Sequence, residues 1–221
     1  MVQLNLRQRE ITLKIVYYGP ALSGKTTNLQ AIHRLLDPGS RGRLMTLDTA
    51  DDRTLFFDLM PVFFQSSSGF LVKLKLFTVP GQVMHNSTRR LVLRGADGIA
   101  FIADSQREQT QSNNDSWRDL VANMKMNGLD PKTLPLVIQF NKRDLANIRS
   151  DEEIHELAQK GKEPIFKATA LRGDGVLETF EGLVRQAWRN LNANYGLESK
   201  LSISEEEFIL QMLKRTPGAT S

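Results

Sequence analysis

At 221 residues, the chain is long enough for one domain with a substantial core but too short for two. Its 40% hydrophobic and 24% charged residues are typical of a soluble globular protein, and no apolar run approaches the ~18 residues that span a bilayer. The lack of cysteine excludes disulfides, thiol catalysis and Cys-ligated zinc, as suits the cytoplasm. The net charge of +4 comes from scattered basic residues, which favours a solvated basic surface over nucleic-acid binding.

The two ends of the chain show no membrane-targeting signal. Residues 1–7 contain no apolar signal core, and Val2 stands where N-myristoylation needs glycine. The last four residues include no cysteine for prenylation. We therefore expect a cytoplasmic protein with no direct membrane anchor, which would reach a membrane only through partners.

The first predicted elements are a strand, a glycine-containing loop and a helix. An apolar, β-rich run over 11–18 predicts the strand, and residues 19–26 then read G-P-A-L-S-G-K-T, which fits the pattern G-x-x-x-x-G-K-[ST]. Apolar residues at helical spacing follow up to the breaker at 37–39. In such a loop, backbone N–H groups surround a phosphate, the lysine (Lys25) reaches the β/γ oxygens and the threonine (Thr26) ligates Mg²⁺. The chain is therefore predicted to bind a nucleoside phosphate.

The remaining elements alternate between strands and helices. Two β-rich runs predict an antiparallel hairpin, three short apolar runs predict buried parallel strands, and apolar periodicity predicts four more helices. The hairpin strands are 55–62 and 70–79, the parallel strands are 98–104, 134–141 and the weaker 164–170, and the helices are 84–94, 109–127, 151–160 and 175–194. This alternation predicts an α/β fold with a mostly parallel six-stranded sheet and helices on both faces. Residues 3–7 form either an extra edge strand or a disordered arm.

The choice between adenine and guanine depends on residues 141–144. They read N-K-R-D directly after a predicted strand, which matches the guanine signature N-K-x-D. The carboxylate of Asp144 can accept hydrogen bonds from both N1–H and the 2-amino group of guanine, whereas adenine offers no such pair of donors. The segment 168–176 follows the last strand and is expected to direct backbone N–H groups to the guanine carbonyl oxygen. The predicted ligand is therefore GTP or GDP.

Taken together, these motifs resemble those of the Ras-like small GTPases and, within them, the bacterial MglA branch. The branch is indicated by the segments at 14–20 (KIVYYGP), 53–58 (RTLFFD), 78–82 (TVPGQ) and 93–98 (LRGADG). The resemblance covers about residues 8–194 and implies a P-loop, Ras-like G domain. It also implies GTP hydrolysis with Mg²⁺, and a role in bacterial cell polarity or motility. The implied partners are a roadblock-type GTPase-activating protein and polarity or motility effectors, the implied setting is the cytoplasm with recruitment to a cell pole, and no nucleic-acid partner is expected.

The resemblance assigns roles to individual residues. Arg53 is identified as an internal arginine finger, Gln82 as the residue that orients the attacking water, and Lys25 as the third catalytic group. The metal ligands are expected to be Thr26 and Thr54. The expected nucleotide-binding residues are Gly19, Ala21, Leu22, Ser23, Gly24, Lys25, Thr26, Thr27, Thr54, Gly81, Asn141, Lys142, Asp144, Thr169, Ala170 and Leu171.

Two positions depart from the family pattern. Thr78 stands where most Ras-like proteins have the aspartate that holds Mg²⁺ through water, so metal binding is expected to depend more on Thr26, Thr54 and the phosphates. Ala21 stands where the branch has glycine, and its methyl group is expected to hinder placement of the catalytic groups. Ala21 thus favours an alternative, a GTP-locked scaffold with little hydrolysis, while Arg53 and Gln82 favour an enzyme.

The chain continues beyond the length of a minimal small GTPase. We expect a GTPase domain over 1–195 and an extension over 196–221. Within the extension, Ser204 and Glu207 have the spacing of a capping box before an apolar stripe that includes Phe208 and Met212. This predicts an amphipathic helix of about eleven residues over 204–215, too short to be stable alone. It should dock either on its own domain or on a partner.

Overall fold

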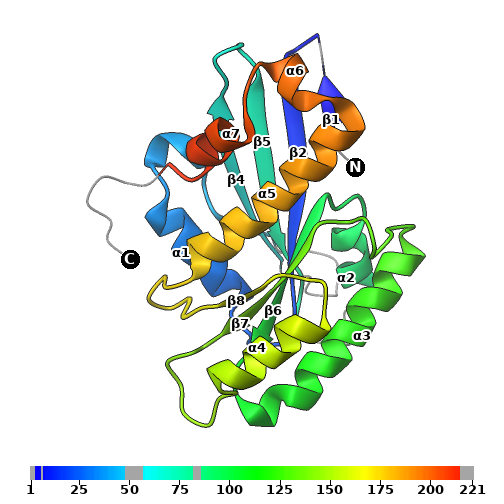
Figure 1. Ribbon diagram of the computed structural model, residues 1–221, viewed down its shortest axis with the longest axis vertical. Helices are drawn as coiled ribbons and strands as arrows, with labels where there is room; N and C mark the ends of the chain where they lie inside the picture. Colours follow the sequence, from blue (N-terminus) through cyan, green and yellow to red (C-terminus); the bar gives the residue numbers. More distant parts are fainter. Residues whose placement is uncertain (1–2, 6, 48–56, 82–85, 215–221) are drawn as a thin grey trace.

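The computed structural model describes residues 3–5, 7–47, 57–81 and 86–214. It is an α/β structure with helices on both faces of one sheet (Figure 1). The strands are β1 (Gln3–Asn5), β2 (Glu10–Tyr18), β3 (Met45–Leu47), β4 (Phe57–Gln65), β5 (Leu71–Thr78), β6 (Gly98–Asp104), β7 (Leu136–Asn141) and β8 (Ile165–Lys167). The α-helices are α1 (Lys25–Leu35), α2 (Asn86–Leu93), α3 (Thr110–Met126), α4 (Asp151–Lys160), α5 (Val176–Tyr195), α6 (Leu197–Leu201) and α7 (Glu205–Met212), and the 3₁₀ helices are η1 (Pro38–Ser40) and η3 (Arg107–Gln109).

The sheet has the order β3-β4-β5-β2-β6-β7-β8, with β1 paired to β2. Strand β2 runs parallel to β5 and β6, and β4 and β5 form the predicted antiparallel hairpin. The sheet holds more strands than the six predicted. One is the edge strand β1, the first of the two alternatives expected for residues 3–7, which pairs antiparallel with residues 10–12 of β2, while β6 pairs with residues 15–18 of the same strand. The other is β3, whose three residues are too few to show an alternating pattern.

Two apolar clusters cover the two faces of the sheet. Along β2, residues Ile11, Leu13, Ile15 and Tyr17 join the cluster that contains side chains from α1, α5 and α7. The intervening Val16 and Tyr18 join the cluster built with α2, α3 and α4. This division follows from the period of two in a strand, where successive side chains point to opposite faces. In the described part of the chain, no helix combines the length and apolarity needed to cross a membrane.

The C-terminal segment packs on the rest of the molecule. Helix α7 has eight residues rather than about eleven, and Ser204 Oγ accepts a hydrogen bond of 3.2 Å from the backbone N–H of Glu207. Residue 215, at the end of the predicted helix, lies outside the described residues. Phe208 is buried, with its ring centroid 4.4 Å from that of Trp188 on α5 and 5.4 Å from that of Phe64 on β4. The apolar stripe of α7 therefore docks within the chain.

Candidate nucleotide-binding site

Two glycines shape the predicted phosphate loop between β2 and α1. Gly19 has φ +148°, and a Cβ there would lie 2.2 Å from the carbonyl oxygen of Ile102. Gly24 has φ +94°, and a Cβ there would lie 2.2 Å from Nδ2 of Asn141. Side chains at either position would collide with neighbouring strands, so the loop needs glycine at both positions for close approach as well as for backbone conformation. Helix α1 begins directly afterwards, at Lys25, so its N-terminus faces the loop.

Lys25 is a buried ammonium group held by the loop itself. Its Nζ donates to the carbonyl oxygens of Gly19, at 3.1 Å, and Pro20, at 2.6 Å. The pKa of Lys25 is lowered to about 7, mainly by burial and to a smaller extent by the nearby Arg89 guanidinium, whereas the Asp58 carboxylate opposes the shift. An anion bound at this loop would stabilise the charged form of Lys25 and raise its pKa again.

Asn141 connects the phosphate loop to the predicted base-binding segments. Its Nδ2 donates to the carbonyl oxygen of Ser23 at 2.8 Å, and its Oδ1 accepts from the backbone N–H of Ala170 at 2.9 Å. The next residue, Lys142, has φ +66° and donates to Asp104 Oδ2 at 2.6 Å. One buried amide thereby fixes the loop after β8 relative to the start of α1, although these segments are more than a hundred residues apart in sequence.

The predicted base-binding side chains lie at the surface around this connection. Asp144 is exposed, and Leu171 and Leu22 are 74% and 88% exposed. Thr169 and Ala170 are buried beneath them. The carboxylate of Asp144 and the side chain of Leu171 are therefore accessible from solvent close in the chain to Asn141 and Ala170, which are buried.

Asp58 on β4 lies at the centre of a cluster of hydroxyl groups. Its Oδ2 accepts from Thr26 Oγ1 at 2.6 Å and from Thr78 Oγ1 at 2.9 Å, and its Oδ1 accepts from Thr46 Oγ1 at 2.9 Å. The carboxylate is 5% exposed, and its backbone N–H donates to Thr78 Oγ1 at 2.8 Å. Strands β3, β4 and β5 and helix α1 thus converge on one buried carboxylate.

Gly81 lies directly against the phosphate loop. A Cβ at Gly81 would lie 2.4 Å from Cα of Ala21 and 3.0 Å from its Cβ. The alanine methyl group therefore occupies the space next to the segment that follows β5. Ser23, in the same loop, is fully buried, and its hydroxyl has no hydrogen-bond partner among the described residues. A buried polar group of this kind calls for a ligand or water.

Comparisons with known proteins agree with this architecture. The model of the Ras family matches residues 46–189. The chain is 43% identical over 182 residues to the mutual gliding-motility protein MglA of Myxococcus xanthus, covering 82% of this chain and 93% of that protein. The chain belongs to the MglA family of Ras-like GTPases.

More distant relatives of this Ras-like chain include plant Rab proteins. Ras-related protein Rab7 of Gossypium hirsutum is 24% identical over 193 residues, which cover 83% of this chain and 85% of that protein. Rab7 of Cenchrus ciliaris is 26% identical over 125 residues, 54% of this chain and 60% of that protein. Membership of the Ras family implies, in general, binding of guanine nucleotides and Mg²⁺ and hydrolysis of GTP.

Three predicted site residues of this Ras-like chain, Arg53, Thr54 and Gln82, lie outside the described residues. The structure brings the other predicted residues together around the phosphate loop, the end of β7 and the segment after β8. Asp58, in contrast, was not among the predicted site residues. The signal that could have identified it is an acidic residue within an apolar strand, next to the strand in which Thr78 replaces the usual aspartate.

Proposed function

We propose that this chain is a guanine-nucleotide-dependent molecular switch, which binds and hydrolyses GTP with Mg²⁺ and signals through the conformation of its switch loops. The observation that carries this proposal is the pair of hydrogen bonds made by the Asn141 amide, which donates to the carbonyl oxygen of Ser23 and accepts from the backbone N–H of Ala170. Those bonds hold a phosphate-binding loop and a base-binding loop in fixed relation, as a nucleotide bridging both would require. The family supports the choice of guanine.

The proposed roles of the residues follow from their places. The loop from Gly19 to Thr27, including Ala21, Leu22, Ser23 and Gly24, binds the phosphates through its backbone, and Lys25 leaves its carbonyl partners to contact them. Asp144 pairs with the base edge, while Lys142 and Leu171 border the ring. Thr169 and Ala170 supply backbone N–H groups. Gly81 contacts the terminal phosphate, whose presence or absence sets the switch conformation.

The proposed Mg²⁺ site consists of Thr26 and Thr54 with the support of Asp58. The chemistry of the donors fits, because Mg²⁺ prefers carboxylate and hydroxyl oxygens, and the Asp58 carboxylate lies 2.6 Å from the hydroxyl of Thr26. When bound, Mg²⁺ neutralises charge on the phosphate oxygens. Among the described residues, no group of three or more acidic or histidine side chains forms a metal site by itself, so the phosphates would complete the coordination.

Hydrolysis is assigned to residues supported by the family resemblance. In this proposal Gln82 orients the attacking water, and Arg53 stabilises charge on the transferring phosphoryl group. In related GTPases an arginine finger contributes about 10³–10⁵ in rate. We further propose that hydrolysis is slow until a roadblock-type activating protein acts. The name of the Myxococcus relative supports a role in gliding motility. We also propose polarity or motility effectors as partners and recruitment to a cell pole, as the family resemblance implies.

The test of guanine recognition is Asp144→Asn. Exchange of the carboxylate for an amide should weaken GTP binding by about 4 kcal/mol, a factor of about a thousand, and improve binding of xanthosine triphosphate. Calorimetric titration with GTP, xanthosine triphosphate and ATP measures this change, and Asp115→Asn on α3 is the matched control. Equal affinity of the native chain for ATP and GTP would refute the proposal.

A second candidate is a GTP-locked scaffold that hydrolyses little. The close approach of Ala21 to Gly81 favours it, because a methyl group there takes space that the catalytic groups need. A displacement of about 1 Å can cost on the order of a hundredfold in rate. Single-turnover hydrolysis by Ala21→Gly and by Arg53→Ala distinguishes the candidates. The glycine variant should be several fold faster and the Arg53 variant slower, both with little change in GTP affinity. A glycine variant that is no faster would remove the steric argument.

A further inference from the structure

Helix α2 turns one stripe of side chains outward. The exposed residues Ser87, Arg90 and Leu91 of α2 and Arg94, directly after its last residue, follow the spacing i, i+3, i+4 and i+7. The backbone N–H of Arg94 still donates to the carbonyl oxygen of Arg90 at 3.1 Å, so the four residues lie on one side of the helix. The opposite side is buried and consists of Thr88, Arg89, Val92 and Leu93. Leu91, in the middle of the outward stripe, is 63% exposed.

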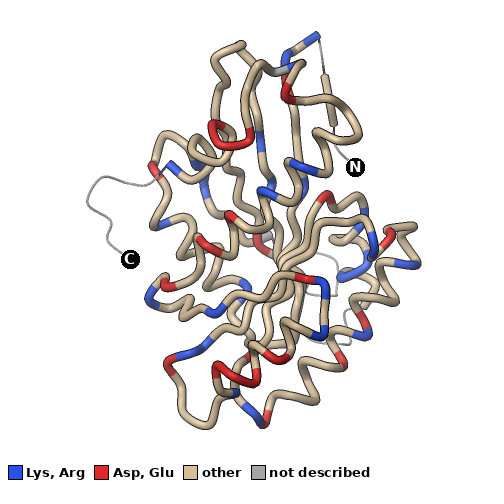
Figure 2. Tube along the Cα trace, viewed as in Figure 1, with Lys and Arg blue, Asp and Glu red and all other residues tan. Residues whose placement is uncertain are grey.

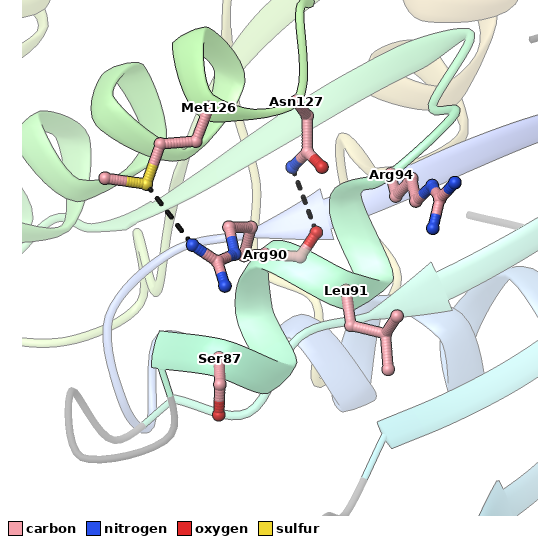
Figure 3. Close-up of a pocket in the computed structure, with 6 residues that line it drawn as sticks. All are labelled: Ser87, Arg90, Leu91, Arg94, Met126 and Asn127. Atoms are coloured by element: carbon pink, nitrogen blue, oxygen red, sulfur yellow. Dashed lines mark hydrogen bonds between the residues drawn. The ribbon is translucent and has the colours of Figure 1, made fainter.

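The end of α3 extends this outward stripe into a groove. Met126 is 67% exposed, and its sulfur accepts a hydrogen bond of 3.6 Å from Arg90 Nη1. Asn127 Nδ2 donates to the carbonyl oxygen of Arg90 at 3.0 Å, so the two helices are joined at this point. The outward stripe, Met126 and Asn127 line a groove of about 520 Å³ (Figure 3). We call this groove the α2–α3 groove.

The charge of the α2–α3 groove is positive. Among the described residues, neither Arg90 nor Arg94 forms an ion pair, whereas Arg107, Arg143 and Arg185 each pair with a carboxylate. An adjoining hollow of about 450 Å³ shares Leu91 and Arg94 and adds Lys14, Lys75 and Phe77. That hollow also contains Asp97, whose carboxylate accepts a hydrogen bond from the backbone N–H of Lys14. Figure 2 shows basic residues on α2 and at the nearby end of α3.

We propose that the α2–α3 groove binds an acidic amphipathic helix of a partner protein. Leu91 and Met126 offer apolar contacts, with Arg90 between them (Figure 3). Arg90 and Arg94 offer guanidinium groups for carboxylates next to these apolar contacts, which is the pattern of helix-in-groove recognition. Charge complementarity selects an acidic partner over a second copy of this chain, whose net charge is +4. The proposal is independent of guanine-nucleotide binding, because none of these residues belongs to the nucleotide site.

The test uses a designed peptide. An alanine-based helix of about 20 residues would present Leu and Met in one stripe with Glu on both sides, and a control peptide would carry Lys in place of Glu. Fluorescence anisotropy with the GDP-loaded full chain should show at least about tenfold tighter binding of the acidic peptide. Binding should weaken as salt rises.

Variants locate the binding. The double change Arg90→Glu and Arg94→Glu should weaken the acidic peptide about tenfold or more, and Leu91→Ala should weaken it several fold with little change in salt dependence. Lys160→Glu on α4 carries the same type of charge change and should alter binding less than twofold. Equal binding of the two peptides, or an unchanged affinity of the double variant, would overturn the proposal.

Two further measurements examine other occupants. Sedimentation velocity of the native chain and the double variant would reveal a second copy at the groove through a change in oligomeric state. Sedimentation with vesicles of phosphatidylglycerol and phosphatidylcholine would reveal an anionic lipid surface. The native chain could fail to bind the peptide but form a dimer or associate with vesicles, and the double variant could abolish that association. This outcome would overturn the proposal and identify a second copy or a lipid surface as the occupant of the groove. Native sedimentation as a monomer without vesicle association, together with peptide binding, is the expected result.

Discussion

Around α5 and α7, one face of the sheet is held by apolar packing, whereas around α2 and α3 the opposite face contains a network of buried polar groups. On the first face, Phe208 packs edge-on against Phe64 and at a tilt against Trp188. On the second, Arg89 is fully buried over the ring of Tyr18, 4.5 Å from its centroid, and lies 3.2 Å from a carboxylate oxygen of Asp119. The Tyr18 hydroxyl donates to that same carboxylate at 2.5 Å.

These two kinds of packing indicate which part of this Ras-like chain can change its conformation. Apolar side chains packed at high density resist rearrangement, since any shift opens a void. A network of hydrogen bonds and charges can exchange partners, and two guanidinium nitrogens of Arg89 have no hydrogen-bond partner among the described residues. Helix α2, which follows the family's second switch segment, is attached through that network. We infer that the apolar packing around α5 and α7 is the fixed frame and that the polar network around α2 and α3 is the adjustable part.

The largest effect is expected from Phe208→Ala, which tests whether the apolar packing around α5 and α7 stabilises the fold. Loss of a fully buried ring should reduce the free energy of unfolding by about 4 kcal/mol, because the cavity lies between α5, α7 and β4. Leu210→Ala on the same helix is the control, since Leu210 is 70% exposed, and it should change stability by less than about 0.5 kcal/mol. Urea unfolding of the nucleotide-free protein measures both. A small loss for Phe208→Ala would mean that α7 does not belong to the frame.

In the polar network around α2 and α3, Asp119→Ala should cost more than Arg89→Met. The first change leaves a buried guanidinium without its carboxylate, at a cost of about 3 kcal/mol, while the second removes a buried cation that is only partly hydrogen-bonded, at a cost of about 1 kcal/mol. A double-mutant cycle by urea unfolding should give a double variant close to Arg89→Met alone. The reverse order would show that Arg89 is a stabilising anchor.

Asp58→Asn tests the one carboxylate at the centre of the hydroxyl cluster beside α1. Loss of charge-assisted hydrogen bonds from Thr26, Thr46 and Thr78 should reduce stability by about 2 kcal/mol. The Mg²⁺ concentration needed for half-maximal nucleotide retention should rise about tenfold if Asp58 supports the metal. Thr46→Val is the control, because it removes one donor to Oδ1 and leaves the Thr26 contact unchanged. An unchanged Mg²⁺ requirement would give Asp58 a purely structural role.

The smallest expected effect is the pH dependence of stability that arises from Lys25, whose pKa is influenced by Arg89 on α2. The pKa of Lys25 is about 7 in the folded, nucleotide-free chain and near 10.5 in the unfolded chain. The unfolded state therefore binds more protons between these values, and stability should rise with pH by about 1 kcal/mol per unit from pH 7.5 to 9. Lys25→Met should flatten this slope.

Arg89→Met should move the pH range in which the free energy of unfolding rises to higher pH, because removal of the guanidinium lets the pKa of Lys25 rise. Phe208→Ala, in the apolar packing around α5 and α7, should leave the profile in place. Urea unfolding at several pH values measures all three. If Arg89→Met left the pH profile of stability unchanged, the charge of Arg89 on α2 would have no measurable effect on the pKa of Lys25 in the phosphate loop.

Much of the architecture could be read from the sequence because its signals are local. The helices predicted at 109–127, 151–160 and 175–194 match α3, α4 and α5 within one residue at each end, since their apolar periodicity is long. The guanine-nucleotide family was also predictable, because its motifs are short contiguous strings. The bounds of β8 were not, since only three residues of the predicted 164–170 pair with β7.

The roles of the site residues remain predictions, and Arg53 and Gln82 lie outside the described residues. The places of several others depended on long-range contacts that no motif contains. Asn141 could be assigned to a base-binding string, but its hydrogen bonds to Ser23 and Ala170 join segments far apart in the chain. An acidic residue within an apolar strand marks Asp58 as unusual, but its partners could not be read from the sequence, because Thr26 and Thr78 approach it only when α1 and β5 pack beside β4.

The amino-acid sequence alone indicated the family and most of the strands and helices in their order along the chain, because these signals come from residues that are adjacent in the chain or recur at a fixed period. The tertiary structure decided where the last helix docks, which carboxylate joins the threonine hydroxyls and which face of α2 stays exposed. These depend on packing between distant elements. An amphipathic stripe shows only that a surface will be covered, and the sheet and helices around it decide by what.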